Sequence, residues 1–293
     1  MKYKKIAILV TFFSLWLSVY FTNPSQEIIA LVFIFSFGIL HGSNDLLLIR
    51  KVNPTRKPVE IFRFFASYIG TVIIGTLLFY FVPVFALAAF IIFSAFHFGE
   101  QHWLDTLTTS IRFNRILFLS YGLTILFLLF ALNSAATIEV IGSLTSVTVD
   151  KNWFHWLLLA SGSLWLAQVF VMVWKKRLTW DQLVFELFML LVFAVVFKTA
   201  TLIWAFAIYF IFWHSIPSIF EQQQFLYGEL SIRTFIKYVK SSFFIWLLSI
   251  SVMALLFLFI DDQKIVIPLL FAFLGAITFA HSFTISKMFE AKK

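Results

Sequence analysis

The sequence predicts an all-α protein, a polytopic integral membrane bundle of about ten transmembrane helices with its N- and C-termini in the cytoplasm. Its composition is the first reason. Of the 293 residues, 61% are hydrophobic and 12% are charged, whereas globular domains are about 45–50% apolar and about 25% charged. A soluble fold could not bury that much apolar surface, but a lipid bilayer removes the need to bury it.

The lengths of the apolar runs are the second reason. Spans of about 20 residues each are enough to cross a bilayer, and ten of them use roughly two thirds of the chain, so we expect one transmembrane domain over residues 1–293. The first run resembles a signal peptide, but it is long and no small-x-small cleavage site follows it, so we expect it to be retained as a span. The loop at 134–152 is rich in Ser and Thr and has room for a short interfacial helix. The expected spans are 6–22, 28–49, 60–82, 84–101, 113–133, 153–174, 182–198, 200–219, 239–260 and 265–287.

The distribution of charge is the third reason, and it also gives an orientation. If the spans alternate in direction, the basic residues gather in the breaks on one side of the membrane, and the breaks on the opposite side are nearly balanced in charge. The positive-inside rule then places both termini in the cytoplasm, and we expect a multi-pass protein of the inner (plasma) membrane. All six basic clusters fall on one side, at 2–5, 50–57, 112–115, 175–177, 233–240 and 287–293.

Composition also excludes several classes of function. The net charge of +8 comes from these short loop clusters, so we expect no nucleic-acid partner. The chain has no cysteine, which excludes disulfides, Cys-ligated zinc, iron–sulfur clusters and thiol catalysis. A metal ion bound by this protein must therefore be held by His, Asp or Glu. No Gly-rich phosphate loop is present, and Lys198, the one candidate for a retinal Schiff base, lies at the end of a span.

Histidines carry the main functional signal. Four of the six lie well inside expected spans, all on even-numbered spans that run from the outer to the inner face. Each lies roughly 13 to 16 residues from the outer end of its span, which is about 20 Å at 1.5 Å per residue. Ionisable residues inside spans are costly and usually face the bundle interior, and imidazole suits iron, zinc, copper or nickel. The sequence therefore predicts one metal site held by His41, His97, His214 and His281.

Four more residues are candidates to orient the ligands. Two of them are acids that follow a span histidine by four and three residues, on the same face of a helix. A carboxylate that accepts an imidazole N–H fixes the tautomer of a ligating histidine. The simpler alternatives stay open, because a buried histidine commonly bonds between helices and an acid at a span end can be a boundary charge. The candidates are Asp45, Glu100, His102 and Glu186.

The segments around the span histidines resemble the sequence elements of a known family, the Brp/Blh family of β-carotene 15,15′-dioxygenases. HGSND at 41–45 resembles the HGxxD element of that family, and SAFHFGE at 94–100 resembles its S-x-x-HFG element. WHSIP at 213–217 is similar to a third, WH-x-x-P-like element, and AHS at 280–282 looks like a final PH-type element. Their order and spacing agree over nearly the whole chain.

The resemblance implies a mononuclear non-haem Fe(II) enzyme in the lipid bilayer. Members of the family cleave all-trans-β-carotene with O2 at its central 15,15′ double bond. The products are two molecules of all-trans-retinal, which supply microbial rhodopsins. The metal ligands that carry over from the family are His41, His97 and His214.

The sequence departs from the family pattern at one position. The family often has a second histidine four residues after the histidine of the third element, and here that position is Ser218. A site with four histidines would then need His281 to complete it, with His102 as the alternative.

Two other functions compete with carotene cleavage. The first is another membrane iron oxygenase, such as a carotenoid hydroxylase or a lipid desaturase, although the HxxHH and HxxxH boxes of those enzymes do not occur here. The second is a transporter or ion-conducting protein that uses intramembrane His and Asp as a relay. Transporters often show inverted repeats and spans broken by Gly or Pro, and neither is clear in this sequence.

Overall fold

The computed structural model describes residues 2–52, 54, 57–104, 106–107, 111–258 and 266–291. Regular secondary structure in these residues is entirely helical. Within the described part of the chain, ten helices are long and apolar enough to cross a membrane, and this confirms the predicted all-α membrane bundle. The cytoplasmic position of the termini and the single domain over 1–293 stay predictions.

The ten helices of membrane-spanning length agree with the ten expected spans in order and position. Residues 259–265, where the ninth expected span ends and the tenth begins, lie outside the described residues, as do parts of the basic clusters at 50–57 and 287–293. The helices cover Tyr3–Tyr20, Asn23–Val52, Phe62–Phe81, Pro83–Leu104, Asn114–Leu132, Asn152–Trp174, Trp180–Thr199, Leu202–Tyr227, Ile232–Leu255 and Leu269–Ala291.

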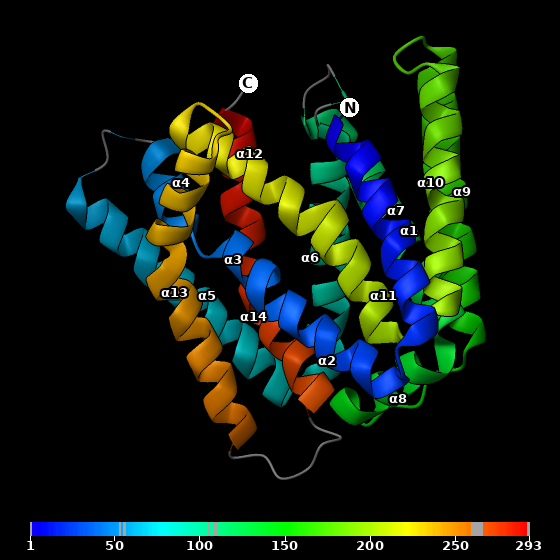
Figure 1. Ribbon diagram of the computed structural model, residues 1–293, viewed down its shortest axis with the longest axis horizontal. Coiled ribbons are helices and arrows are strands. Elements are labelled where there is room, and N and C mark those ends of the chain that lie inside the picture. Colours follow the sequence, from blue (N-terminus) through cyan, green and yellow to red (C-terminus); the bar gives the residue numbers. More distant parts are fainter. Residues whose placement is uncertain are drawn as a thin grey trace. The chain divides into compact units, whose positions relative to one another are not determined.

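The chain forms two compact units, each assembled from several segments. Unit 1 holds Met1–Phe33, Ser94–Gly142 and Val147–His214, and unit 2 holds Ile34–Phe93, Ser143–Ser146 and Ser215–Lys293. Figure 1 shows the order of the helices along the chain.

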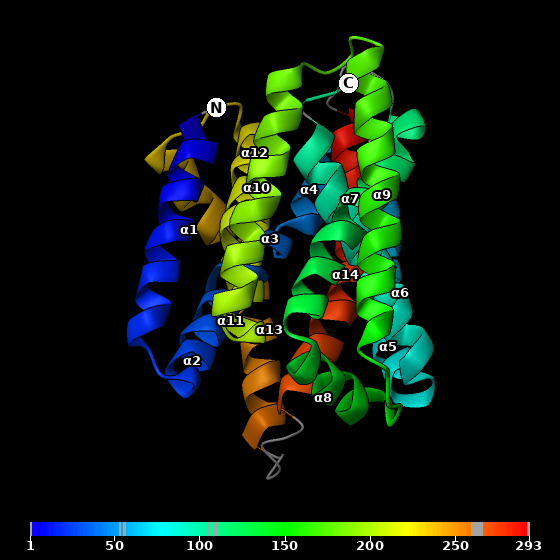
Figure 2. The ribbon, with the colours of Figure 1, turned by 90° about the vertical axis from the view of Figure 1, so that its right-hand side faces the viewer.

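Unit 1 contains the first span and most of the central part of the chain. In it α7 packs against α9 over much of its length (Figure 2), and α2 packs against α11. The helix α8 lies in the Ser/Thr-rich loop at 134–152. The elements are α1 (Lys2–Tyr20), α2 (Asn23–Phe33), the second half of α6 (Pro83–Leu104), α7 (Ile111–Leu132), α8 (Ser134–Thr145), α9 (Asn152–Trp174), α10 (Trp180–Thr199), α11 (Leu202–Tyr209) and the π-helix η2 (Phe210–Ser215).

Unit 2 combines helices from an early part of the chain with the helices of its C-terminal part. Its last helix, α14, packs against α5 and α4, and α13 packs against α3. Its elements are the π-helix η1 (Ile34–Gly38), α3 (Ile39–Gly42), α4 (Asp45–Val52), α5 (Pro58–Phe81), the first half of α6, α12 (Ile216–Tyr227), α13 (Ile232–Leu258) and α14 (Val266–Ala291).

The ends of several helices follow directly from the local sequence. Pro83 begins α6. The N–H of a first helical residue has no partner within the helix, so the N–H that proline lacks costs little there. Thr179 caps α10 in a capping box, because Gln182 N–H donates to its hydroxyl at 3.2 Å and its own N–H donates to the Gln182 side chain at 2.8 Å. Gly228 ends α12 with φ of 79°, a left-handed conformation that favours glycine.

Two of the ten spans are interrupted by π-helix, and both carry a predicted ligand there. The segment η1 ends three residues before His41, and η2 contains His214. Short π segments inside α-helices are rare and frequently lie at functional sites. Pro217, two residues after η2, lacks an N–H, so this stretch of main chain is short of one hydrogen-bond donor.

Helices α6 and α7 approach each other very closely inside unit 1. A Cβ atom on Gly99 of α6 would overlap the carbonyl of Phe118 and lie 2.8 Å from its Cα. A Cβ atom on Gly122 of α7 would overlap the carbonyl of Ala95 and lie 2.6 Å from its Cα. Small residues let helix backbones meet in this way in membrane proteins, and this contact places the segment of α6 that carries His97.

Candidate metal centre

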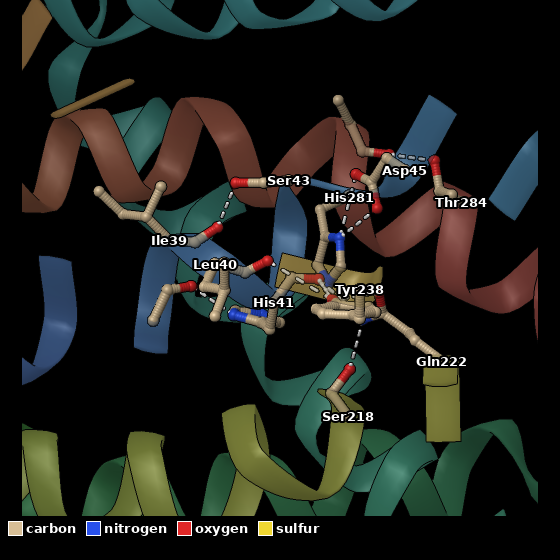
Figure 3. A network of polar contacts seen from close by, with 12 residues as sticks. Ile39, Leu40, His41, Ser43, Asp45, Ser218, Gln222, Tyr238, His281 and Thr284 are labelled. Carbon is tan, nitrogen blue, oxygen red and sulfur yellow. Dashed lines mark hydrogen bonds and ion pairs between the residues drawn. The ribbon is translucent and has the colours of Figure 1, made fainter. Parts of the chain in front are cut away.

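Unit 2 brings two of the predicted ligands, His41 and His281, side by side. Their ring centroids are 4.7 Å apart and the rings are perpendicular (Figure 3). Both side chains are buried, with 5% and 3% of their surface exposed. His41 comes from α3 and His281 from α14, so residues 240 positions apart in the chain meet here.

Each of these two histidines has one ring nitrogen bonded to an acceptor. His41 Nδ1 donates to the carbonyl of Gly38. His281 Nδ1 donates to both carboxylate oxygens of Asp45, at 2.8 and 3.0 Å. Because a carbonyl or a carboxylate can only accept, Nδ1 carries the proton in both rings and the lone pair is on Nε2. This tautomer is the one that a neutral histidine needs to ligate a metal through Nε2.

Unit 1 brings the other two predicted ligands together. The rings of His97 and His214 have centroids 4.6 Å apart and an interplanar angle of 79°, and each side chain is 1% exposed. Two phenylalanine rings also contact His214. The centroid of the Phe98 ring lies 4.6 Å from that of His214, and Phe210 stacks on the His214 ring with centroids 5.6 Å apart. The imidazoles are thus held in an apolar and aromatic environment.

Asp45 has a different partner from the one that the sequence indicates. Its position four residues after His41 predicts the same helix face, but its carboxylate bonds to His281 instead. The reason is a turn at Ser43 and Asn44, after which Asp45 begins the new helix α4. The i, i+4 relation of a continuous helix therefore does not apply.

His102 and Glu186 pair with each other in unit 1. His102 Nε2 lies 2.8 Å from Glu186 Oε2, and both side chains are largely buried. The ring of Tyr121 stacks on His102 with centroids 4.4 Å apart, and Lys4 Nζ lies 3.8 Å from the other oxygen of Glu186. The remaining candidate, Glu100, is buried on α6.

The model of the family described as beta-carotene 15,15'-dioxygenase matches residues 32–289, which is most of the chain. The chain belongs to the β-carotene 15,15′-dioxygenase family. No curated protein and no solved structure matches it. The matched region contains all four span histidines and leaves out α1.

Ser218, where the dioxygenase family often has histidine, takes part in a hydrogen-bond network in unit 2. It is 1% exposed, and its hydroxyl accepts from Gln222 Nε2 at 3.0 Å. The same amide donates to the main-chain carbonyl of His41 at 2.8 Å (Figure 3). The serine thus supports the main chain at a histidine through Gln222.

Sequence reasoning missed the polar side chains that hold the π segments. In unit 1 the indole N–H of Trp213 donates to Thr11 Oγ1 at 2.9 Å, and the Tyr3 hydroxyl donates to the Phe212 carbonyl. In unit 2 the Trp246 indole donates to the carbonyls of η1 at 3.0 and 3.1 Å. An uncharged polar residue inside an apolar span was the available signal, because such a residue needs a partner in lipid.

The Fe(II) site that the family resemblance implies should bind its ion more weakly when the Asp45 carboxylate is removed. We expect Asp45→Ala to lower the affinity about 10- to 100-fold, the usual effect of losing a group that orients a ligating histidine. Asp45→Asn keeps one acceptor oxygen and should have a smaller effect. Competition with a coloured Fe(II) chelator measures the affinity. Asp181→Ala, which removes an exposed acid on α10, is the control, and equal affinities for the Asp45 and Asp181 variants would contradict this role.

Proposed function

We propose that this protein cleaves all-trans-β-carotene with O2 at the central 15,15′ double bond and releases two molecules of all-trans-retinal. The observation that carries the proposal is membership of the dioxygenase family over residues 32–289, with four buried histidines on the matched segments. In the reaction one carbon–carbon double bond is broken and two carbonyl bonds form. Both oxygen atoms come from O2, so no external reductant is needed.

We further propose that His41, His97, His214 and His281 hold one Fe(II) ion. The first two and His281 form a group that could bind a metal, and we propose His214 as the fourth ligand. The donor set fits the ion, because neutral imidazoles suit ferrous iron. Neutral ligands also leave the ion its full positive charge. The acceptors on Nδ1 of His41 and His281 favour ligation through Nε2. Bound iron would supply the activation of O2.

The residues of the chain have three tasks in this proposal. The histidines hold the ion, and Asp45 orients His281. Phe98 and Phe210 beside His214 exclude water and offer apolar surface to a hydrocarbon. The substrate has no group that must gain or lose a proton, so no general acid or base is required. Glu100, His102 and Glu186 remain proposed supports of the site, the last two acting as a pair.

The bilayer supplies the substrate in this proposal. β-Carotene is a pure hydrocarbon that dissolves in lipid, and the chain is a multi-pass membrane protein by its ten apolar helices. We propose that it lies in the inner (plasma) membrane with both termini in the cytoplasm, and that carotene enters sideways between helices. The retinal that it releases would supply a microbial rhodopsin.

Expression in cells that make β-carotene tests the reaction. The orange colour should fade and retinal should appear in the extract, as measured by chromatography. His41→Ala, His97→Ala and His214→Ala should each reduce retinal to background. His155→Ala, at an exposed histidine whose Nδ1 bonds to the Lys151 carbonyl, should leave it unchanged. If the wild-type chain is present in the membrane and the amount of carotene is unchanged, the proposal is contradicted.

Two measurements on the purified protein separate the alternatives. One iron per chain supports carotene cleavage, and two would favour a hydroxylase or desaturase. Movement of protons or metal ions in liposomes, without cleavage of carotene, would favour a transporter.

A further inference from the structure

Two buried glutamines place their side-chain amides on the main-chain carbonyls of the two histidines near the π segments. In unit 2, Gln222 Nε2 donates to the carbonyl of His41 at 2.8 Å. In unit 1, Gln101 Nε2 donates to the carbonyl of His214 at 3.2 Å. The two glutamines are 0% and 6% exposed. The same arrangement therefore occurs once in each unit.

Both carbonyls lie where a helical segment ends or changes type. His41 lies in the last turn of α3, which ends at Gly42 before the turn at Ser43 and Asn44, and side chains commonly bond to the carbonyls of a last turn. His214 lies one residue before the end of η2, where the π segment passes into α12. A main-chain carbonyl left unpaired in an apolar interior costs about as much as a lost hydrogen bond. An amide N–H from another helix satisfies it and fixes its position.

The network around Gln222 determines which way its amide points. The Tyr238 hydroxyl donates to Gln222 Oε1 at 2.8 Å, so the oxygen end faces Tyr238. The nitrogen end then faces the His41 carbonyl and the Ser218 hydroxyl (Figure 3). All three side chains are buried. Burying an amide without partners is costly, and both ends of this amide have partners.

We infer that Gln101 and Gln222 are positioning residues that set the main chain at His214 and His41, and so the direction of both imidazoles. The inference rests on the proposed iron site and goes beyond it, since each glutamine acts through a main-chain carbonyl. The His41 ring is then fixed from two sides, by Gln222 on its carbonyl and by Gly38 on Nδ1. His214 has Gln101 on its carbonyl and two aromatic rings against its imidazole.

Replacement by methionine, which has a similar shape and no amide, tests the inference. Gln222→Met should lower Fe(II) affinity about 10-fold or more and should shift the ligand-field bands of the Co(II)-substituted protein. Gln101→Met should do the same to a smaller extent, because its hydrogen bond is longer. Each variant has a matched control. Gln223→Met removes a buried amide that bonds to Ser231 and Thr234. Gln168→Met removes a half-buried amide that bonds to Ser120 and Leu164.

The Co(II) spectrum separates positioning from a loss of stability. A purely structural role would lower the unfolding temperature of a glutamine variant and of its control alike, without moving the bands of the folded protein. If Gln222→Met and Gln101→Met match their controls in Fe(II) affinity and in Co(II) spectrum, the inference is overturned.

A second variant covers the case in which Gln222→Met does not fold. Tyr238→Phe leaves the glutamine in place but removes the hydroxyl that lies 2.8 Å from its Oε1 and 3.3 Å from the His41 carbonyl. It should shift the Co(II) bands and weaken Fe(II) binding less than Gln222→Met, and an unchanged spectrum and affinity would overturn the inference. A wild-type chain that binds neither Fe(II) nor Co(II) would instead refute the proposed iron site, and the inference with it.

Discussion

With the proposed iron site, His281→Ala is expected to remove iron binding and retinal formation as completely as His41→Ala. The two rings are 4.7 Å apart and both are buried. His281 also has a charged orienting partner, the carboxylate of Asp45, with oxygens 2.8 and 3.0 Å from Nδ1. Its loss would take one donor from that buried carboxylate, which is costly. Iron per chain, measured by mass spectrometry of the purified protein, and retinal formed in carotene-producing cells check the prediction.

The contrast with Ser218 makes the prediction specific to His281. The family pattern often has a histidine at the position that is Ser218 in this chain. A site with four histidines therefore needs His281 as its fourth ligand. Ser218→Ala removes one acceptor of the Gln222 amide and should keep most of the iron. Iron content and retinal near the wild-type level in a folded His281→Ala protein would remove His281 from the ligand set.

The sequence predicts the spans and the common depth of the four span histidines for physical reasons. A span must be about 20 residues of apolar side chains, so its length and position are written locally in the chain. The depth of each span histidine follows from the rise of a helix. His41 and His281 meet in unit 2, and His97 and His214 meet in unit 1, as side chains at one depth can.

Contacts between helices could not be predicted in the same way. The turn at Ser43 and Asn44 moves Asp45 away from the helix face that its spacing indicates. The pairing of His102 with Glu186 depends on how α6 and α10 pack inside unit 1. Apolar periodicity carries little information in lipid, because the outside of a membrane bundle is as apolar as its interior. Partners of buried polar side chains therefore become known only from the packed structure.

The largest loss of stability is expected from a single methyl group in unit 1. Gly99→Ala would place a Cβ atom against the carbonyl and Cα of Phe118, with the Cα at 2.8 Å. The obstacle is main chain, so no side chain can turn aside, and α6 and α7 must separate. Overpacking of a close contact typically costs about 1–3 kcal/mol, and a backbone clash belongs at the upper end. Because His97 lies two residues before Gly99, separation of the helices should also displace His97.

We therefore expect Gly99→Ala to lower the midpoint of thermal unfolding in detergent and to lower the iron content with it. Gly70→Ala is the matched control, since a Cβ atom at Gly70 of α5 has nothing within 4 Å. It adds the same methyl group to a membrane helix and should leave both quantities unchanged or slightly raise stability, because alanine has the higher helix propensity. Gly122→Ala, on the facing helix, would meet the Ala95 main chain and should resemble Gly99→Ala. A Gly99→Ala protein as stable as Gly70→Ala would show that α6 and α7 are not in close contact here, and would remove the packing that we hold responsible for the position of His97.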